Sequence, residues 1–227
     1  MIAPISRASV PDLVFASLCD AILTGRYAPG ERLPTQRTLA AELGVNMASV
    51  RAALGRLEQL RLVEVRHGDA MRVLDWRQSG GLEALAVLGS VEPSTVTALF
   101  EARRLLLTEA ARLAAERRTD EQAERLHELA RSLANATDDH AALLADWSYM
   151  STIVEAAGNL VFQLIMNSVR ELYLPRIELF APVVADRAAL APLYARGAEA
   201  VAAADGDGAA DAVGELAAAQ EREMGHS

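Results

Sequence analysis

The chain has 227 residues, of which 52% are hydrophobic and 4% aromatic, and it carries a net charge of −9. This length suffices for one large domain or two small ones with a buried core. No apolar run approaches the ~18 residues of a membrane span, and the first residues show no signal-peptide pattern. The single cysteine, Cys19, excludes an intrachain disulfide. We therefore expect a cytoplasmic protein without membrane contact.

The charge is unevenly distributed along the chain, and arginine is used throughout in place of lysine. Residues 1–76 carry a charge of +1, whereas residues 77–227 carry −10. Because the guanidinium group suits phosphates and base edges, the first segment is the candidate for contact with nucleic acid. The acidic second segment is a candidate for contact with a different partner.

The first third of the sequence predicts three helices. Apolar residues recur at helical spacing over residues 13–23, and the segment "APGERLP" then interrupts the helix. Thr35 is placed as the N-cap of a second short helix, which Gly44 ends. Asn46 is placed as the N-cap of a third helix, "MASVRAALGRLEQLR". The last two helices therefore form a candidate helix-turn-helix.

A short hairpin is predicted after the third helix, with the strands "LVEV" and "MRVL" on either side of "RHGDA". A helix-turn-helix followed by a two-stranded hairpin has the order of a winged helix. Gly68 at the tip allows the backbone to approach DNA closely, and Arg66 and His67 can reach phosphates or the minor groove. The alternative is an ordinary hairpin with polar residues in its turn.

The third helix has a chemistry that suits the major groove of DNA. We expect Ala48, Ser49 and Ala52 to face outward near its start, where small side chains let the helix sit deep in the groove. Arg37 and Arg51 flank this surface and can pair with phosphates or guanines. The N-terminus of the helix itself favours a phosphate.

The remainder of the sequence predicts an all-helical domain. We expect a winged-helix domain over 1–76, a linker over 77–81 and a helical effector-binding and dimerisation domain over 82–227. The predicted helices of the second domain span 82–88, 93–117, 119–135, 137–156, 159–179, 187–204 and 208–224.

The segments "PGERLPTQRTLAAELGV" and "VRAALGRLEQLRLVEVRHG" resemble the GntR family of bacterial transcriptional regulators. The resemblance implies a homodimer that binds a pseudo-palindromic operator in double-stranded DNA. The positions that it implies as DNA contacts are Arg37, Asn46, Ala48, Ser49, Arg51, His67 and Gly68. Met47 stands among these contacts where the family usually has arginine, so the operator sequence stays open.

The segments "LFEARRLLLTEAARLAAERR" and "DWSYMSTIVEAAGNLVFQLIMNSVRELY" resemble the effector domain of the FadR branch of that family. The resemblance implies an antiparallel helical bundle with a ligand pocket between the helices. Many relatives hold a metal there through one Asp and three His. Asp146 matches the Asp, but Met150, Tyr194 and the segment 215–220 occupy the histidine positions. We therefore expect no metal and no other cofactor.

An apolar pocket for an anionic amphiphile is the expected replacement for the metal site. The residues expected to form this effector site are Arg103, Leu107, Asp146, Met150, Leu164, Tyr173 and Arg176. The FadR group proper also lacks the metal and senses long-chain acyl-CoA. The resemblance therefore implies an acyl-CoA or a fatty acid as effector.

These inferences together predict a ligand-responsive bacterial transcriptional regulator of fatty-acid or lipid metabolism, not an enzyme. Several alternatives stay open at this point. The expected pocket residues could simply be bundle core, and the effector could be a small organic acid bound without a metal. The chain could also be an enzyme that uses Asp146 and Arg103, or a helical scaffold with an incidental hairpin.

Overall fold

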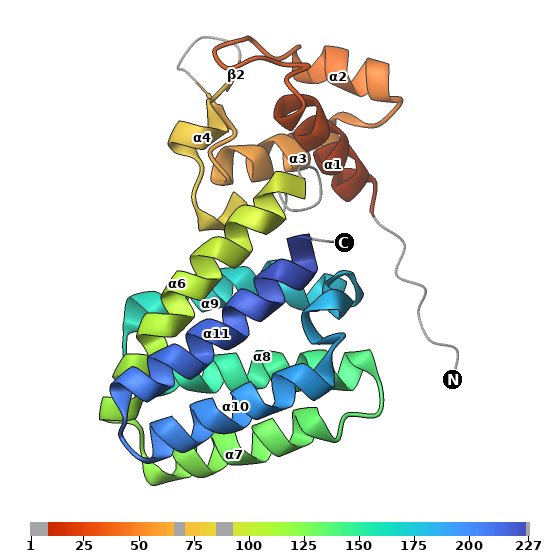
Figure 1. The fold of residues 1–227 in the computed structure, drawn as a ribbon. Coiled ribbons are helices and arrows are strands. Elements are labelled where there is room, and N and C mark those ends of the chain that lie inside the picture. The colour runs from red at the N-terminus through yellow and green to blue at the C-terminus, as the bar shows by residue number, and fades with distance from the viewer. Residues whose placement is uncertain (1–8, 66–70, 85–92, 226–227) are drawn as a thin grey trace. The chain divides into compact units, whose positions relative to one another are not determined.

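The computed structural model describes residues 9–65, 71–84 and 93–225. The chain divides into two compact units, Met1–Val91 and Glu92–Ser227, and each has a hydrophobic core of its own. Helices predominate in both units, and the described strands form one small antiparallel sheet (Figure 1). The predicted fold class, a winged helix-turn-helix followed by a helical bundle, is confirmed. Within the described ranges, no helix combines the length and the apolar character needed to cross a membrane.

The N-terminal unit begins with the three predicted helices. They are α1 (Val10–Leu23), α2 (Gln36–Leu43) and α3 (Met47–Gln59). Each helix starts at a polar side chain, Ser9, Thr35 or Asn46, that accepts a hydrogen bond from the backbone amide three residues further on. Gly44 ends α2 in the left-handed conformation, with φ of 65°, which glycine adopts without strain. The sequence therefore determines both helix boundaries around the turn.

The core of the N-terminal unit lies mainly between α1 and α3. Their buried faces carry Val14, Leu18, Cys19, Ile22, Val50, Leu54 and Leu57. At the edge of this core, the Arg56 guanidinium lies 3.9 Å from the ring centroid of Phe15 and donates a 2.7 Å hydrogen bond to Asp12. Hydrogen bonds from Ser9 and Arg56 lower the pKa of Asp12. This contact joins the start of α1 to the exposed side of α3.

The predicted hairpin is present as a short antiparallel pair, β1 (Val63–Glu64) and β2 (Arg72–Val73). Val63 faces Val73 in the register, and both side chains are buried in the core of the unit. A third segment lies beside β2, because the backbone of Arg32 forms an isolated antiparallel bridge with Arg72. The turn residues 66–70, which include Arg66, His67 and Gly68, lie outside the described residues.

A short helix, α4 (Trp76–Ser79), follows the hairpin and covers part of the stretch expected as a linker. Gly80 caps it, and a side chain at this position would place Cβ 2.6 Å from the carbonyl oxygen of Trp76. The 3₁₀ turn η1 (Leu82–Ala84) comes next. Residues 85–92, which include most of the helix expected over 82–88, lie outside the described part of the chain.

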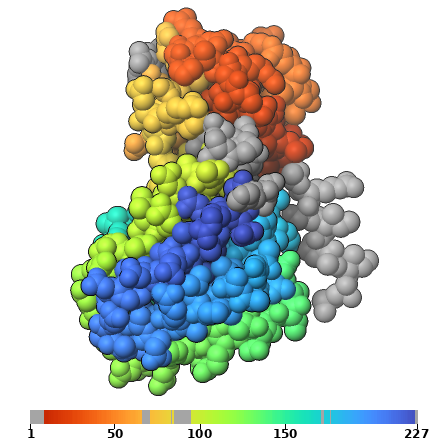
Figure 2. All heavy atoms as spheres, in the orientation of Figure 1, coloured from red at the N-terminus to blue at the C-terminus, as the bar shows by residue number. Residues whose placement is uncertain are grey.

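The C-terminal unit consists of helices, as the sequence predicts. They are α6 (Pro93–Arg117), α7 (Asp120–Ala134), α8 (Asp139–Ala156), α9 (Leu160–Tyr173), η2 (Leu174–Val184), α10 (Arg187–Ala202) and α11 (Gly206–Gly225). Long helices α6 and α11 run antiparallel side by side, and α10 lies between α11 and α7 (Figures 1 and 2). Helix α8 packs against α6, α7 and η2. The arrangement is an antiparallel bundle.

One predicted boundary in this unit is wrong. The helix expected over 159–179 ends at Tyr173 and continues as the eleven-residue 3₁₀ segment η2. Pro175 explains the change, because proline has no amide hydrogen to continue the α-helical bonding and its ring clashes with the carbonyl four residues before it. Pro182 lies inside η2 and acts in the same way. This segment brings Phe180 and Val183 into the core of the bundle.

Two arginines at the end of α6 bond to the ends of other helices. Arg117 donates a 2.8 Å hydrogen bond to the carbonyl of Ala157, after the end of α8. Arg118 donates one of the same length to the carbonyl of Ala202, at the end of α10. These carbonyls have no partner within their own helices, so the arginines satisfy them and fix the helix ends together.

Candidate functional site

The first candidate site is the exposed side of α3 in the N-terminal unit. The side chain of Asn46 accepts a 2.8 Å hydrogen bond from the amide of Ser49, which starts the helix directly after the turn at Gly44. Met47, Ala48 and Arg51 are exposed, and Met47 retains 45% of its accessible surface. A side of a helix that combines small residues with an arginine can enter a major groove.

Ser49 does not belong to this exposed side, contrary to the expectation from the sequence. Its side chain is only 5% exposed. Ser49 lies one turn before Ala53 and next to Val50, and both of these residues are fully buried in the core. The periodicity of the helix therefore turns Ser49 inward, although its small polar side chain would be compatible with either side.

The other expected DNA contacts of this unit have different positions. Arg37 is exposed on α2, and Asn46 is exposed at the start of α3. Arg66, His67 and Gly68 lie in the turn that is outside the described residues. The structure also shows a hydrogen bond near the hairpin that the sequence did not indicate. Arg72 in β2 donates a 3.1 Å hydrogen bond to the carbonyl of Gly30, which ties the hairpin to the segment before α2.

The second candidate site is a group of buried polar side chains in the C-terminal unit, the central polar cluster. Its members are Arg103 from α6, Asp146 from α8, Tyr194 from α10 and Gln220 from α11. Oδ1 of Asp146 accepts hydrogen bonds from Tyr194 Oη at 2.5 Å and from Gln220 Nε2 at 2.8 Å. Arg103 donates a 2.7 Å hydrogen bond to Gln220 Oε1, and its Nη2 lies 3.4 Å from Asp146 Oδ2. Asp146 is 1% exposed.

An aromatic group lies close to the central polar cluster. The ring of Tyr173 stacks on Trp147 with centroids 5.2 Å apart and lies 4.6 Å from the ring of Phe180. The hydroxyl of Tyr173 is buried and has no hydrogen-bond partner. Burial raises the pKa of Tyr173, and the charge of Asp146 raises it further, whereas Arg103 lowers it. An unsatisfied buried hydroxyl is costly and is a candidate for contact with a ligand.

The residues expected to form the effector site fall into three groups. Arg103, Asp146 and Tyr173 come together around the central polar cluster, as described above. Leu107 and Met150 are at most 1% exposed and belong to the main hydrophobic core. Leu164 was predicted wrongly, because it lies on the outer side of α9 with 55% of its surface exposed. The side chain of Arg176 lies outside the described part of the structure.

The donor set of this cluster does not fit the metal that the resemblance implies. Of the expected ligand positions, Asp146 and Tyr194 come together with Gln220, which lies in the segment 215–220. Burial, together with the charge of Asp146 and its hydrogen bond, raises the pKa of Tyr194 well above its usual value, so its phenol keeps its proton. An amide, a protonated phenol and a thioether are poor substitutes for three imidazoles. The described residues contain no group of three or more metal-ligating His, Cys, Asp or Glu side chains.

Comparison with protein families gives two matches that together cover most of the chain. Residues 12–73 match the family model described as "Bacterial regulatory proteins, gntR family", and residues 98–219 match the model of the FCD domain. The first match contains the helix-turn-helix and the hairpin. The second match contains three of the four members of the central polar cluster. The fourth, Gln220, is the first residue after the matched range.

Individual relatives and solved structures agree with these matches. The HTH-type transcriptional regulator Mce2R of Mycobacterium tuberculosis is 36% identical over 217 residues, which are 94% of this chain and 90% of that protein. The fatty acid metabolism regulator protein of an Enterobacter species is 29% identical over 69% of this chain and 66% of its own length. The solved structure of Lar, which controls the Listeria monocytogenes agr system, is 16% identical and superposes with a TM-score of 0.64 over 98% of this chain and 99% of its own.

The fold, the two matched domains and the extent of the similarity lead to one assignment. Both domains occur in the expected order, and the relatives named above are transcriptional regulators rather than enzymes. The chain therefore belongs to the GntR family of bacterial regulatory proteins, as a transcriptional regulator with an FCD domain.

Proposed function

We propose that this regulator binds a pseudo-palindromic operator as a homodimer, and that an acyl-CoA or a fatty acid in the C-terminal unit controls its affinity for the operator. Two copies of a helix-turn-helix related by a twofold axis read two half-sites about one turn of DNA apart. We propose that the effector binds next to the side chains of Arg103 and Tyr173. The proposed effect of the ligand is release of the operator.

The exposed side of α3 supports the DNA contacts of the proposal. Arg51 is exposed one turn after Met47, near the N-terminus of α3, which Asn46 caps. In this position the guanidinium can pair with a guanine or a phosphate, while Ala48 allows close approach to the groove. Arg37 on α2 is the proposed phosphate contact beside it. The residues Arg66, His67 and Gly68 are proposed for the groove next to the hairpin.

The buried hydroxyl of Tyr173 is the observation that carries the effector site. It has no partner, and it lies within electrostatic reach of the guanidinium of Arg103, a side chain that is only 15% exposed. A carboxylate or thioester carbonyl of an effector could accept a hydrogen bond from Tyr173 and interact with the charge of Arg103. The rings of Trp147, Tyr173 and Phe180 would contact the apolar part of the same ligand.

The class of effector is supported by the Enterobacter relative named for fatty acid metabolism. A small organic acid is the second candidate, because a specific observation favours it. Leu107 and Met150 are packed inside the main core rather than along an open wall, and Leu164 points away from it. A compact acid would need only the polar group around Arg103 and Tyr173.

A titration of the operator complex tests the proposal. An operator would first be selected from random duplexes by the purified protein, and the labelled duplex would then be titrated with palmitoyl-CoA, oleate, free coenzyme A and citrate. The proposal predicts that palmitoyl-CoA or oleate lowers operator affinity, and that coenzyme A does not. Release by citrate alone would support the second candidate. Unchanged affinity with every compound would reject control by either class.

The coupling between the two ligands provides an independent check. Because allosteric coupling is reciprocal, an effector that weakens operator binding must itself bind less tightly in the presence of operator. The affinity of the effector would be measured with and without the selected duplex, and with a scrambled duplex as the control. Equal effector affinity in all three cases would contradict the proposed release.

A further inference from the structure

The hydrogen-bonding capacity of the central polar cluster is used within the cluster itself. Oδ1 of Asp146 accepts one hydrogen bond from Tyr194 and one from Gln220. The amide of Gln220 is engaged at both ends, because its oxygen accepts from Arg103 and its nitrogen also donates to Tyr194 Oη at 2.9 Å. A cation bound to Oδ1 of Asp146 would displace these donors, and they would lose their partners in the interior of the protein.

The charge of the cluster is also balanced without a bound ion. Asp146 contributes a carboxylate, and Arg103 contributes a guanidinium 3.4 Å from its Oδ2. The amide of Gln220 and the phenol of Tyr194 are neutral. A buried charge needs a partner of opposite sign, and this carboxylate has one in the arginine. A divalent cation at the same place would leave a positive charge without compensation.

The neighbouring position on α8 gives no better ligand. Met150 lies one turn after Asp146 and is 1% exposed in the hydrophobic core. Its thioether is a soft ligand, which suits copper(I) rather than the divalent ions that carboxylate and imidazole hold. Leu143 and Ile153 on the same helix are likewise buried and apolar. Asp146 is therefore the one conventional ligand within the cluster, because Glu215 in the segment 215–220 pairs with Arg196 at the surface.

We propose that the central polar cluster replaces a metal ion in this chain, so that the helices are joined at this place by hydrogen bonds and one ion pair and the domain is independent of metals. The cluster joins α6, α8, α10 and α11, whereas the ligand positions that the resemblance implies lie on α8, α10 and α11. This inference concerns the architecture of the domain and does not depend on which effector it binds.

Metal content and thermal unfolding of the wild-type protein test the inference directly. The purified full chain would be dialysed against Zn²⁺, Ni²⁺ or Mn²⁺ and then against metal-free buffer, and its metal content measured by mass spectrometry. We expect far less than one ion per chain and no shift of the unfolding temperature on addition of EDTA. One retained ion per chain, with a lower unfolding temperature in EDTA, would overturn the inference.

Substitution of Gln220 tests whether the cluster itself holds the helices. Gln220→Leu removes both ends of the amide while keeping much of its volume. It is expected to lower the unfolding temperature by the same amount with and without EDTA. Gln163→Leu on α9, outside the cluster, is the matched control and should cause a much smaller shift. No destabilisation by Gln220→Leu relative to the control would overturn the structural role of the cluster.

A variant with three histidines tests whether the central polar cluster lies where a metal ion would bind. Met150→His, Tyr194→His and Gln220→His together would place three imidazoles around Asp146. The combined variant is expected to bind one Zn²⁺ per chain and to unfold at a higher temperature with Zn²⁺ than with EDTA. A folded variant without Zn²⁺ binding would show that the cluster does not occupy the place of a metal. If this variant fails to fold, the wild-type metal content and Gln220→Leu decide the inference.

Discussion

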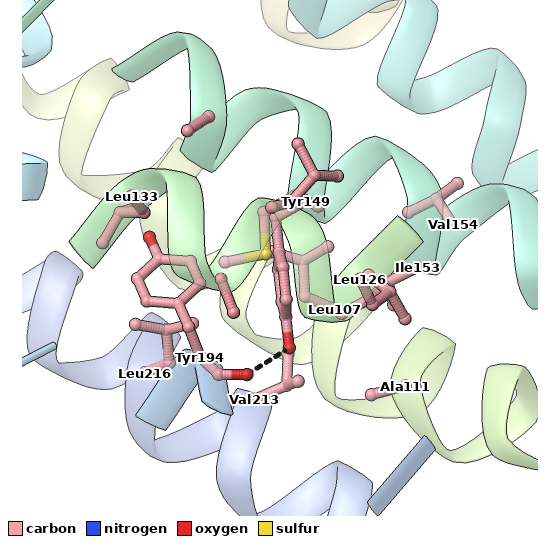
Figure 3. Packing of buried hydrophobic residues seen from close by; sticks show 14 of the residues in the cluster. Leu107, Ala111, Leu126, Leu133, Tyr149, Ile153, Val154, Tyr194, Val213 and Leu216 are labelled. Carbon is pink, nitrogen blue, oxygen red and sulfur yellow. Dashed lines mark hydrogen bonds between the residues drawn. The ribbon is translucent and has the colours of Figure 1, made fainter. Parts of the chain in front are cut away.

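The phenol of Tyr149 donates a 2.9 Å hydrogen bond to the backbone carbonyl of Tyr194, and this bond joins α8 to α10 inside the C-terminal unit (Figure 3). Both side chains are fully buried, and their rings meet edge to face with centroids 4.9 Å apart. The same tyrosine whose carbonyl accepts this bond donates its hydroxyl to Asp146. The aromatic core and the central polar cluster are therefore continuous with each other.

This contact predicts that Gly197→Ala destabilises the C-terminal unit. A Cβ at position 197 would lie 2.6 Å from Tyr149 Oη and 3.2 Å from Val213 Cγ2. The hydroxyl cannot move away without losing its bond to Tyr194. We expect a loss of about 1–3 kcal/mol in the free energy of unfolding, measured by urea denaturation, despite the better helix propensity of alanine.

A double-mutant cycle with Tyr149→Phe provides the control for this prediction. Tyr149→Phe removes the oxygen that the new methyl group would meet, so the additional cost of Gly197→Ala should be smaller in that background. Equal costs in the two backgrounds would show that the hydroxyl is not responsible for the destabilisation.

Burial of Cys19 predicts a loss of stability at alkaline pH. Burial raises the pKa of the Cys19 thiol from 9.0 to about 12, because the thiolate is disfavoured in the apolar core. The contribution of the buried thiol to the free energy of unfolding is fully present below pH 9, where the thiol is protonated in both the folded and the unfolded chain. It is lost as the pH rises from about 9 to about 12, where the unfolded chain releases its proton first.

Unfolding measured by urea at a series of pH values checks this dependence. Cys19→Ala should decline less steeply than the wild type above pH 9, whatever its absolute stability. Slopes that do not differ between the two proteins would contradict the assignment of this thiol to the core.

The local and the long-range features of this structure could be predicted from the sequence to different extents. The caps at Thr35 and Asn46 and the glycine at 44 are local signals, and the structure confirms them. The partnership of Gln220 with Asp146 joins residues 74 positions apart, and no local pattern indicates it. The resemblance indicates Tyr194 and the segment 215–220 as ligand positions, but only the packing of four helices shows that the side chains of Tyr194 and Gln220 meet.

The errors of the sequence interpretation have identifiable physical causes. Ser49 was assigned to the outer side of its helix because serine is small and polar, but the spacing to Ala53 places it inside. Leu164 was assigned to a pocket because it is apolar, although it lies on the exposed side of α9. The helix through Tyr173 was extended because the apolar spacing continues, whereas Pro175 ends it.

Tyr173→Phe is predicted to separate effector binding from stability. The substitution removes a buried hydroxyl that has no partner in the protein, so the free energy of unfolding without ligand should stay the same or rise by about 1 kcal/mol. Effector affinity should fall about tenfold, which corresponds to about 1.4 kcal/mol. Both quantities can be measured by calorimetry on the same preparations.

Tyr149→Phe is the matched control for that experiment. Its hydroxyl is already bonded to Tyr194, so its loss should cost about 1 kcal/mol of stability and leave effector affinity unchanged. If Tyr173→Phe destabilises the protein and binds the effector normally, then Tyr173 is a core residue and not a ligand contact.

Met47→Arg is predicted to change the preferred operator. Met47 is exposed at the first position of α3, where a guanidinium could pair with the O6 and N7 atoms of a guanine. Such a contact contributes about 1–3 kcal/mol of discrimination between bases. Selection from random duplexes should give the variant a stronger preference for guanine at one position in each half-site. Identical selected sequences for both proteins would show that residue 47 does not contact a base.

The central claim, that α3 reads the operator, is tested most directly by fluorescence anisotropy on the selected duplex with the wild type, Arg51→Ala and Arg26→Ala. Arg26 is an exposed arginine after α1 in the same unit and controls for the loss of one charge. The account predicts that Arg51→Ala weakens operator binding by about 1–3 kcal/mol, or ~5- to 150-fold, and that Arg26→Ala changes it far less. Equal affinities of the wild type and Arg51→Ala, with both proteins folded, would contradict it.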